Sequence, residues 1–164
     1  MIPQVKKILY TTDLSKNSVY AFYHAVDMAK KYDAKICMLH VIETIPASAY
    51  GTRTDKLYQD QREAAEAVIR NRIRNFCDRV DQKKNLACME RIAKLLVENG
   101  DPAQEILKAA EQEGCNLMVL GRHGKGFLEQ TFLGSVSRSV MDRAKIPVLV
   151  IPVPSEEASV WDEI

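Results

Sequence analysis

The sequence has no apolar run long enough to cross a membrane. Its longest apolar stretches, such as 117–120 (LMVL) and 148–151 (VLVI), are far shorter than the roughly 20 residues that a transmembrane helix needs. The first residues, MIPQVKK, also lack the basic region, apolar core and cleavage site of an export signal. We therefore expect no membrane partner and, by default, a cytoplasmic protein.

An excess of charge of either sign is missing as well. Lysine and arginine number 23 against 22 aspartate and glutamate residues, a formal net charge of +1, so no overall field would draw the chain to nucleic acid. Charged side chains of both signs mark the outer face of one long expected helix: Arg62, Glu63, Glu66, Arg70 and Arg74. Such a mixture is typical of a solvated helix surface, and we expect no nucleic-acid partner.

The cysteines show no grouping. They are Cys37, Cys77, Cys88 and Cys115, without the short spacings of a zinc site or a disulfide framework. Isolated cysteines are mostly buried and behave as small apolar side chains. We therefore expect reduced, buried thiols and no metal site.

The chain does contain the material for one globular domain. Its 164 residues are 46% hydrophobic and 27% charged, close to the globular average, and a chain of this length buries roughly 70% of its unfolded surface on folding. No boundary or repeat is visible within residues 1–154, which we expect to form a single domain. We expect residues 155–164 to form an acidic, mobile C-terminal tail; the alternative is that Trp161, the only tryptophan, anchors it on a partner.

Short apolar segments alternate with amphipathic ones along the chain. Apolar residues between polar breaks or glycines predict strands at 5–11, 34–42, about 90–98, 117–120 and 148–151. Helical spacing predicts helices at 15–32, 57–80, after Asp101-Pro102, and at 135–145. This alternation predicts an α/β fold with a largely parallel sheet and helices on both faces.

A glycine-rich segment follows the fourth expected strand. Residues 121–137 read GRHGKGFLEQTFLGSVS and lead into the next helix. Glycine lets a backbone approach a ligand closely, and unpaired N–H groups at a helix start attract phosphate oxygens. The same residues would also suit an ordinary turn at Gly121 and Gly124 and a helix cap at Gly134 or Ser135.

The spacing Gly121-x2-Gly124-x9-Gly134-Ser135 resembles the nucleotide-binding signature of the ATP-binding branch of the universal stress protein family. The similarity extends to 12–15 (TDLS) after the first strand, to 39–41 (LHV) ending the second, and to 100–102 (GDP), and it covers roughly residues 4–153. Other phosphate motifs fit less well. No Lys-Ser or Lys-Thr pair ends the loop as in a P-loop, and no G-x-G-x-x-G follows the first strand.

The resemblance implies a five-stranded parallel sheet in the order 3-2-1-4-5 with helices on both faces, similar to Rossmann-like and adenine nucleotide alpha-hydrolase-like folds. Strand order then reverses between strands 1 and 4, and ligands of such sheets bind beyond the carboxyl ends at that reversal, where Asp13 and Gly121 lie. It also implies a homodimer through the final strand, whose apolar edge between Pro147 and Pro152 would need protection.

The resemblance also assigns ligand contacts in three groups. The base would be held by Asp13 and the backbone of Val41, with Thr12 nearby. The ribose and first phosphate would be wrapped by Gly121, Arg122, His123 and Gly124. The outer phosphates would meet backbone N–H groups and hydroxyls of Gly134, Ser135, Val136 and Ser137. The expected ligand is ATP, or else ADP or AMP, and any Mg²⁺ or Mn²⁺ would arrive with the phosphates.

Plainer roles are open to several of these residues. Asp13 is also a favoured cap for the first helix. His40, inside an apolar strand, is expected to be a hydrogen-bonded core residue, and His24 to be structural. Thr11 stands where the family often has a small apolar residue or proline, which alters the base pocket. The basic residues of this segment are Arg122, His123 and Lys125. Each would be equally compatible with exposure to solvent and with an ionic contact to phosphate.

Two functions from different classes fit this pattern. The first is a regulatory nucleotide-binding module of the stress response, with no catalytic residue. The second is slow ATP hydrolysis, which needs a positioned water and a base; His123 is the one candidate in the loop. A phosphoacceptor receiver domain fits poorly, because Leu14 rather than a second acid follows Asp13 and no aspartate ends the third strand.

Overall fold

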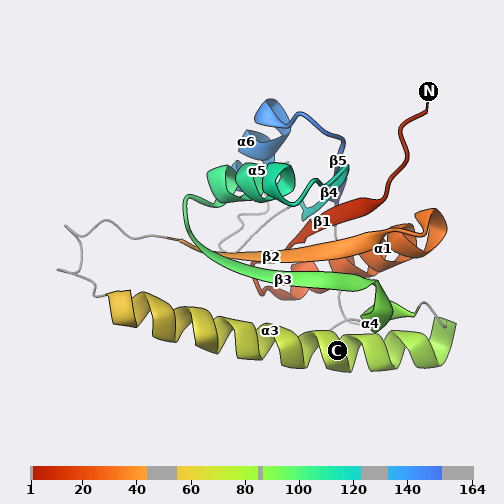
Figure 1. Cartoon of the computed structure of the whole chain (residues 1–164), viewed down its shortest axis with the longest axis horizontal. Helices are drawn as coiled ribbons and strands as arrows, with labels where there is room; N and C mark the ends of the chain where they lie inside the picture. Colours follow the sequence, from red (N-terminus) through yellow and green to blue (C-terminus); the bar gives the residue numbers. More distant parts are fainter. Residues whose placement is uncertain (1, 44–54, 85–86, 123–132, 153–164) are drawn as a thin grey trace.

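The computed structural model describes residues 2–43, 55–84, 87–122 and 133–152. Its strands form one parallel sheet in the order β3-β2-β1-β4-β5 (Figure 1). They are β1 (Lys7–Thr11), β2 (Lys35–Glu43), β3 (Ile92–Gly100), β4 (Leu117–Gly121) and β5 (Val148–Ile151). The expected α/β class and strand order are confirmed. The expected C-terminal tail, with Trp161, lies outside the described residues.

The helices of the described ranges are α1 (Lys16–Tyr32), α3 (Asp55–Lys84), α4 (Cys88–Arg91), α5 (Pro102–Gln112) and α6 (Ser135–Arg143). α6 ends two residues before the expected boundary, because Ala144 already has an extended ψ of 138°. None of these helices is both long enough and apolar enough to span a bilayer.

One face of the sheet is covered by α1 and α3. Side chains alternate along a strand, so Ile8 and Tyr10 of β1 face this layer while Leu9 faces the other. The helices contribute apolar stripes at helical spacing: Ala21, Phe22, Ala25, Val26 and Ala29 from α1, and Ile69, Ile73, Phe76, Cys77 and Val80 from α3. The Phe22 ring lies 5.0 Å from that of Tyr10 and 4.7 Å from that of Phe76, which makes this core aromatic.

The opposite face is covered by α5 and α6 with smaller side chains. Ile106 and three alanines of α5, together with Val140 of α6, pack on alternate residues of the central strands. α5 begins as the sequence predicts: Asp101 accepts a hydrogen bond from the Gln104 amide at 2.9 Å, and Pro102 stands in the first turn. Just before it, Gly100 adopts a φ of 152°, which a side chain would disfavour.

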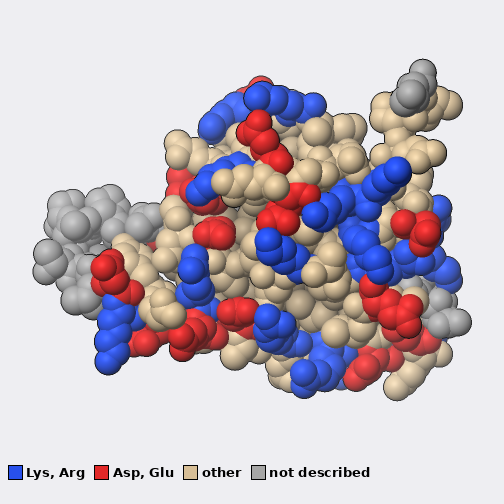
Figure 2. All heavy atoms as spheres, in the orientation of Figure 1, with Lys and Arg blue, Asp and Glu red and all other residues tan. Residues whose placement is uncertain are grey.

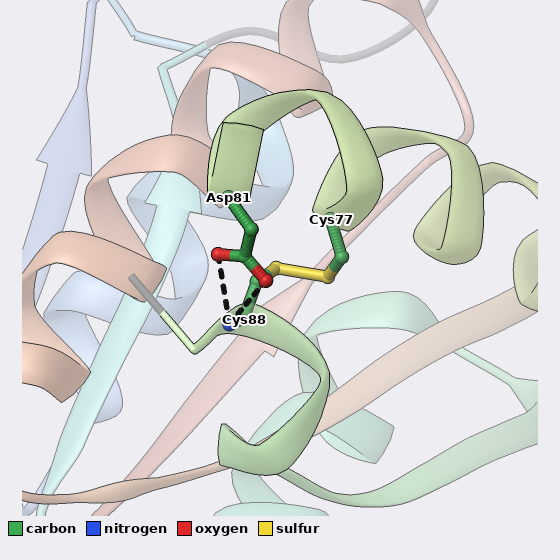
Figure 3. Close-up of a disulfide and its surroundings, with 3 residues drawn as sticks. All are labelled: Cys77, Asp81 and Cys88. Carbon is green, nitrogen blue, oxygen red and sulfur yellow. Dashed lines mark hydrogen bonds between the residues drawn. A yellow bond between two sulfur atoms is a disulfide. The ribbon is translucent and has the colours of Figure 1, made fainter. Parts of the chain in front are cut away.

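The prediction of reduced cysteines is wrong for two of them. Cys77 and Cys88 form a disulfide that joins α3 to α4, with their Cα atoms 5.1 Å apart (Figure 3). The short helix α4 was also missed, and β3 consequently begins at Ile92 instead of residue 90. A separation of 11 residues carries no pairing signal, because only the packing of α3 on the sheet brings its last turns beside Cys88. Cys37 and Cys115 are free and buried, as expected.

Charges of both signs are interspersed on the face of the molecule seen in Figure 2. On α3, Arg70 pairs with Glu66 one turn earlier at 2.8 Å. Arg62 reaches off the helix to Glu98 of β3 at 3.2 Å. The mixed outer surface expected for this helix is therefore present, with one of its arginines tied to the sheet.

Candidate functional site

The strand order reverses between β1 and β4. β1 pairs with β2 on one side and with β4 on the other, and because all are parallel, β1 and β4 end at the same edge of the sheet. Thr11 is the last residue of β1, and Gly121 is the last of β4. Ligands of such sheets bind at this edge, here formed by residues 12–15, the end of β4 and the start of α6.

Asp13 shapes the loop between β1 and α1, which we call the β1–α1 loop (residues 12–15). Its Oδ1 accepts hydrogen bonds from the backbone N–H of Ser15 at 2.9 Å and from the Ser15 hydroxyl at 2.5 Å. Ser15, not Asp13, is the N-cap residue of α1. The other carboxylate oxygen, Oδ2, is buried and has no hydrogen-bond partner among the residues that the structure describes. Buried oxygens almost always have a donor, so this atom marks a place for one.

Thr12 ties the same loop to the sheet. Its N–H donates to the Leu39 carbonyl at 2.9 Å, and its own carbonyl accepts from His40 Nδ1 at 2.8 Å. Its hydroxyl donates to Ser18 Oγ at 2.9 Å and accepts from the Leu14 N–H at 3.0 Å. Every polar group of Thr12 is therefore engaged in holding the loop. His40 is the hydrogen-bonded core residue that the sequence predicts.

Leu14 carries a backbone conformation unusual for its residue type. Its φ is 65°, in the left-handed region that disfavours side chains. From α3, Arg72 donates through Nη1 to the Leu14 carbonyl at 2.6 Å. Sequence reasoning missed Arg72, because a single arginine among many on a charged helix gives no sign of a contact 58 residues away.

Val41 lies just beyond the level at which β1 ends. Thr11 is paired with Leu39, and the Leu39 carbonyl points toward the β1 side, where it binds Thr12. Residues two apart in a strand direct their backbone groups to the same side, so the N–H and carbonyl of Val41 also face the side on which β1 has ended. This placement makes the Val41 backbone available next to the β1–α1 loop.

Two hydrogen bonds join the end of β4 to the start of α6, and a third joins it to β5. The Ser137 hydroxyl donates to the Gly121 carbonyl at 2.8 Å. The Gly134 N–H donates to the Arg122 carbonyl at 2.9 Å, and the Arg122 N–H donates to the Ile151 carbonyl at 2.9 Å. The structure therefore brings together four residues predicted for the phosphate side, Gly121, Arg122, Gly134 and Ser137. His123 and Gly124 lie outside the described residues.

The first turn of α6 is open within the described part of the chain. Gly134 is the N-cap residue, with φ −63° and ψ 155°, and no side chain caps the helix. Its carbonyl accepts the first intrahelical bond, from Arg138. The N–H groups of Ser135 and Val136 thus point out of the helix start, where the helix dipole favours an anion. The hydroxyl proton of Ser137 is already donated to the Gly121 carbonyl.

Tyr10 lies beneath the β1–α1 loop and offers no acid–base chemistry. Burial raises its pKa well above the ordinary value. Its hydroxyl donates to the Ser18 carbonyl, and its ring stacks on Phe22. Tyr10 therefore stays neutral and supports the floor of the loop.

No group of three or more His, Cys, Asp or Glu side chains comes together to hold a metal ion in the ranges that the structure describes. Asp13 has no second acidic side chain among its bonded partners there. Any divalent cation at this edge would be held mainly by the ligand's own phosphate oxygens.

Comparison with known sequences gives a match over nearly the whole chain. The sequence model described as the universal stress protein family matches residues 4–152. A universal stress protein of Methanocaldococcus jannaschii is 31% identical over 157 residues, covering 93% of this chain and 85% of that protein. A universal stress protein of Bacillus subtilis is 31% identical over 147 residues, covering 88% of this chain and 97% of that protein.

Solved structures show the same fold. The universal stress protein UspA from Lactobacillus plantarum superposes with a TM-score of 0.71 at 23% identity, covering 92% of this chain and 99% of that chain. A universal stress protein in complex with cAMP has a TM-score of 0.61 at 22% identity, with 92% and 98% coverage. An Arabidopsis thaliana family protein with AMP bound has a TM-score of 0.56 at 18% identity, with 93% and 94% coverage.

Proposed function

This chain belongs to the universal stress protein family, and from that premise we propose that it binds an adenine nucleotide, ATP foremost, as a regulatory module of the stress response. The observation that carries the proposal is the unsatisfied, buried Oδ2 of Asp13 at the switch of strand order. Proteins of the same fold solved with cAMP and with AMP support the ligand class.

The base is placed at the β1–α1 loop. Asp13 Oδ2 lacks a donor, and the exocyclic amino group of adenine is a donor, so the two are complementary. The Val41 backbone, free of β1 on that side, supplies a donor and an acceptor for the ring edge. Thr12 acts by holding the loop, because its own polar groups are already bonded.

The phosphates are placed at the start of α6. Open N–H groups of Ser135 and Val136 suit phosphate oxygens, and the bonds from Gly134 and Ser137 to the β4 end hold this turn beside Gly121 and Arg122. His123 and Gly124 complete the proposed set in the glycine-rich loop. Mg²⁺ or Mn²⁺ would be bound through the phosphates, adding neutralising charge.

Native mass spectrometry and calorimetry with ATP test the proposal directly. Replacing Gly134 and Ser135 by glutamate should abolish binding, because side chains and negative charge would occupy the phosphate position. The matched control is Met141→Glu, which puts a charge on an exposed position of α6 away from its first turn. Unchanged ATP affinity in the double variant would remove the start of α6 from the site.

We propose that binding, rather than turnover, is the functional event. The described part of the site holds donors for phosphate but no base aimed at the outermost phosphate, and in-line attack needs a positioned water. Slow ATP hydrolysis remains the alternative, with His123 as its base. Turnover of about 1 per second or faster, lost in His123→Ala, would show that the protein is an ATPase.

A second copy of the chain is the proposed partner. β5 lies at the edge of the sheet, where Val148, Leu149 and Val150 are only half-buried, and an unpaired apolar edge strand needs cover. Pairing of two β5 strands about a two-fold axis would supply it, in a cytoplasmic homodimer. Light scattering that gives the monomer mass at tens of micromolar protein would contradict the dimer.

A further inference from the structure

The disulfide joins the end of α3 to the chain that enters β3. In Figure 3, Cys77 points from α3 toward Cys88 at the start of α4, and both side chains are fully buried. The Asp81 carboxylate, one turn after Cys77, accepts from the Cys88 N–H at 3.1 and 3.2 Å. α4 is held separately to α1, because Arg91 donates to the Ala29 carbonyl and to Asp33.

The buried side chains of α3 all lie from Ile69 onward. None of its residues from 55 to 68 is buried, whereas Ile69, Ile73, Phe76, Cys77 and Val80 all are. The disulfide lies within this short anchoring stripe. If the disulfide were lost, the buried stripe, the Asp81 hydrogen bonds and the Arg62–Glu98 ion pair would be left to position this helix of 30 residues.

The same part of α3 also holds the β1–α1 loop. Arg72 precedes Cys77 by five residues, about 7.5 Å along the helix axis, and donates to the Leu14 carbonyl at 2.6 Å. Leu14 has the disfavoured φ of 65°, so the loop depends on its hydrogen bonds to keep this shape. Asp13, whose Oδ2 has no partner, is the neighbouring residue. A shift of α3 would therefore be transmitted by Arg72 to the proposed base site.

We propose that the Cys77–Cys88 disulfide is a redox switch for nucleotide binding, acting through α3 and Arg72 on the β1–α1 loop; this rests on the proposed function. The oxidised protein is the tight-binding form. Arg72 is a positioning residue, since it reaches the loop and not the ligand. Disulfides of cytosolic proteins are rare and mostly transient or redox-sensing, which agrees with a switch in a cytoplasmic stress protein.

The switching reaction is thiol–disulfide exchange with a dithiol reductant. One thiolate of the reductant attacks a sulfur of the pair, the S–S bond breaks, and the second thiol of the reductant resolves the mixed disulfide. Cys77 and Cys88 gain two electrons and two protons, and the reductant becomes a disulfide. Because both sulfurs are buried, exchange requires local opening of the packing around the disulfide, so we expect reduction to be slow.

The test measures ATP affinity of the full chain by calorimetry in both redox states, with the thiols counted by alkylation and mass spectrometry. The oxidised protein should expose two alkylatable cysteines after denaturation and the reduced protein four. Reduction should weaken ATP binding about five- to tenfold, the low end of ordinary coupling between two sites. Equal affinities, or a protein whose Cys77 and Cys88 stay alkylatable under oxidising conditions, would overturn the switch.

These results separate the switch from the proposed function. ATP binding of equal strength in both states leaves the nucleotide-binding function standing and removes the switch alone. Absence of ATP binding in both states removes both. Circular dichroism of the reduced protein checks that it remains folded, so that a loss of affinity reports on the site.

Variants test the route through Arg72. Cys77→Ser/Cys88→Ser should bind ATP as weakly as the reduced protein and ignore reductant, whereas Cys37→Ala/Cys115→Ala, which keeps the disulfide, should still respond to it. Arg72→Gln should lower the affinity of the oxidised protein and abolish its response to reduction. Arg74→Gln, on the same helix and exposed, is the matched control. A full redox response in Arg72→Gln would overturn the proposed route.

Discussion

The two faces of the sheet are fastened in different ways. On the face of α1 and α3, aromatic rings fill the core and a disulfide closes the edge near the start of β3. On the face of α5 and α6, the core that the structure describes has no aromatic rings, and ion pairs connect the end of α5 to the sheet. There, Glu113 at the end of α5 binds Lys94 of β3 at 2.7 Å, and Lys7 of β1 lies 3.7 Å from its other oxygen.

Because one face contains a disulfide and the other does not, only the first face should respond to reductant. A disulfide is insensitive to salt and moderate pH but is broken by reductant. An ion pair near the surface is insensitive to reductant but is weakened by salt and acid. The base side of the proposed site belongs to the first face, so redox conditions should act mainly on that half of the ligand, whereas salt and acid also act on the Arg62–Glu98 and Arg91–Asp33 pairs of that face.

The largest expected effect comes from the aromatic core. Phe76 is buried at 2% exposure and contacts the Phe22 ring, so Phe76→Ala should lower the free energy of unfolding by about 4 kcal/mol through lost burial and a cavity. Urea denaturation followed by circular dichroism measures it. Leu57→Ala, on the same helix but 41% exposed, should change stability by less than about 0.5 kcal/mol.

The aliphatic face should be less sensitive to a similar deletion. Ile106→Ala removes a residue that is 4% exposed and lies in a core cluster whose described members include no aromatic rings, and we expect a loss of about 3 kcal/mol in the same denaturation experiment. A larger loss than that of Phe76→Ala would contradict the view that the aromatic face dominates stability.

The cap of α5 should contribute less again. Asp101→Ala leaves the Gln104 N–H without its side-chain acceptor and should cost about 1 kcal/mol. Asp101→Ser restores an acceptor and should recover most of that loss. If alanine and serine gave the same melting temperature, the capping bond would have no role in stability.

The smallest effect should come from the ion pairs of Glu113 with Lys94 and Lys7. Hydrogen bonding from Lys94, helped by Lys7, lowers the pKa of Glu113, so the unfolded chain takes up this proton more readily than the folded one. The resulting stability is present above the unfolded pKa of about 4.3 and is lost as pH falls through the lower, folded pKa. Glu113→Gln should therefore cost roughly 0.5 kcal/mol at neutral pH and almost nothing below about pH 3.

The pH dependence gives this last prediction its control. The difference between wild type and Glu113→Gln should also shrink in 1 M salt, because the lysines are partly exposed and exposed charges are screened. A difference that is constant from neutral pH to acid would show that glutamine disturbs packing and that the ion pairs contribute nothing.

Much of the fold could be predicted from local pattern. The bounds of the strand at 148–151 agree with the structure residue for residue, and α5 begins at its expected cap and proline. The error at β3 concerns Glu90 and Arg91, which directly precede the apolar run and carry no local signal that separates the end of a helical turn from the start of a strand. The hydrophobic pattern indicates which residues are buried, but burial alone does not distinguish a helical turn from the start of a strand.

For the candidate site, the sequence predicted which strand ends meet but not the connections between the residues there. Asp13 and Gly121 were placed correctly at neighbouring strand ends. Sequence did not reveal that the Ser137 hydroxyl is bound to Gly121, or that Ser15 replaces Asp13 as the cap of α1. These choices depend on distances between segments that are far apart along the chain.

The sequence by itself determined the α/β class and the apolar stripes of strands and helices, because strand and helix periodicity are properties of short segments. The tertiary structure alone decided the Cys77–Cys88 pair, the hold of Arg72 on Leu14 and the unpartnered oxygen of Asp13. Each of these features depends on how α3 packs against the sheet and its loops. Contacts between segments that are far apart in the chain leave no periodic pattern in the sequence from which they could be predicted.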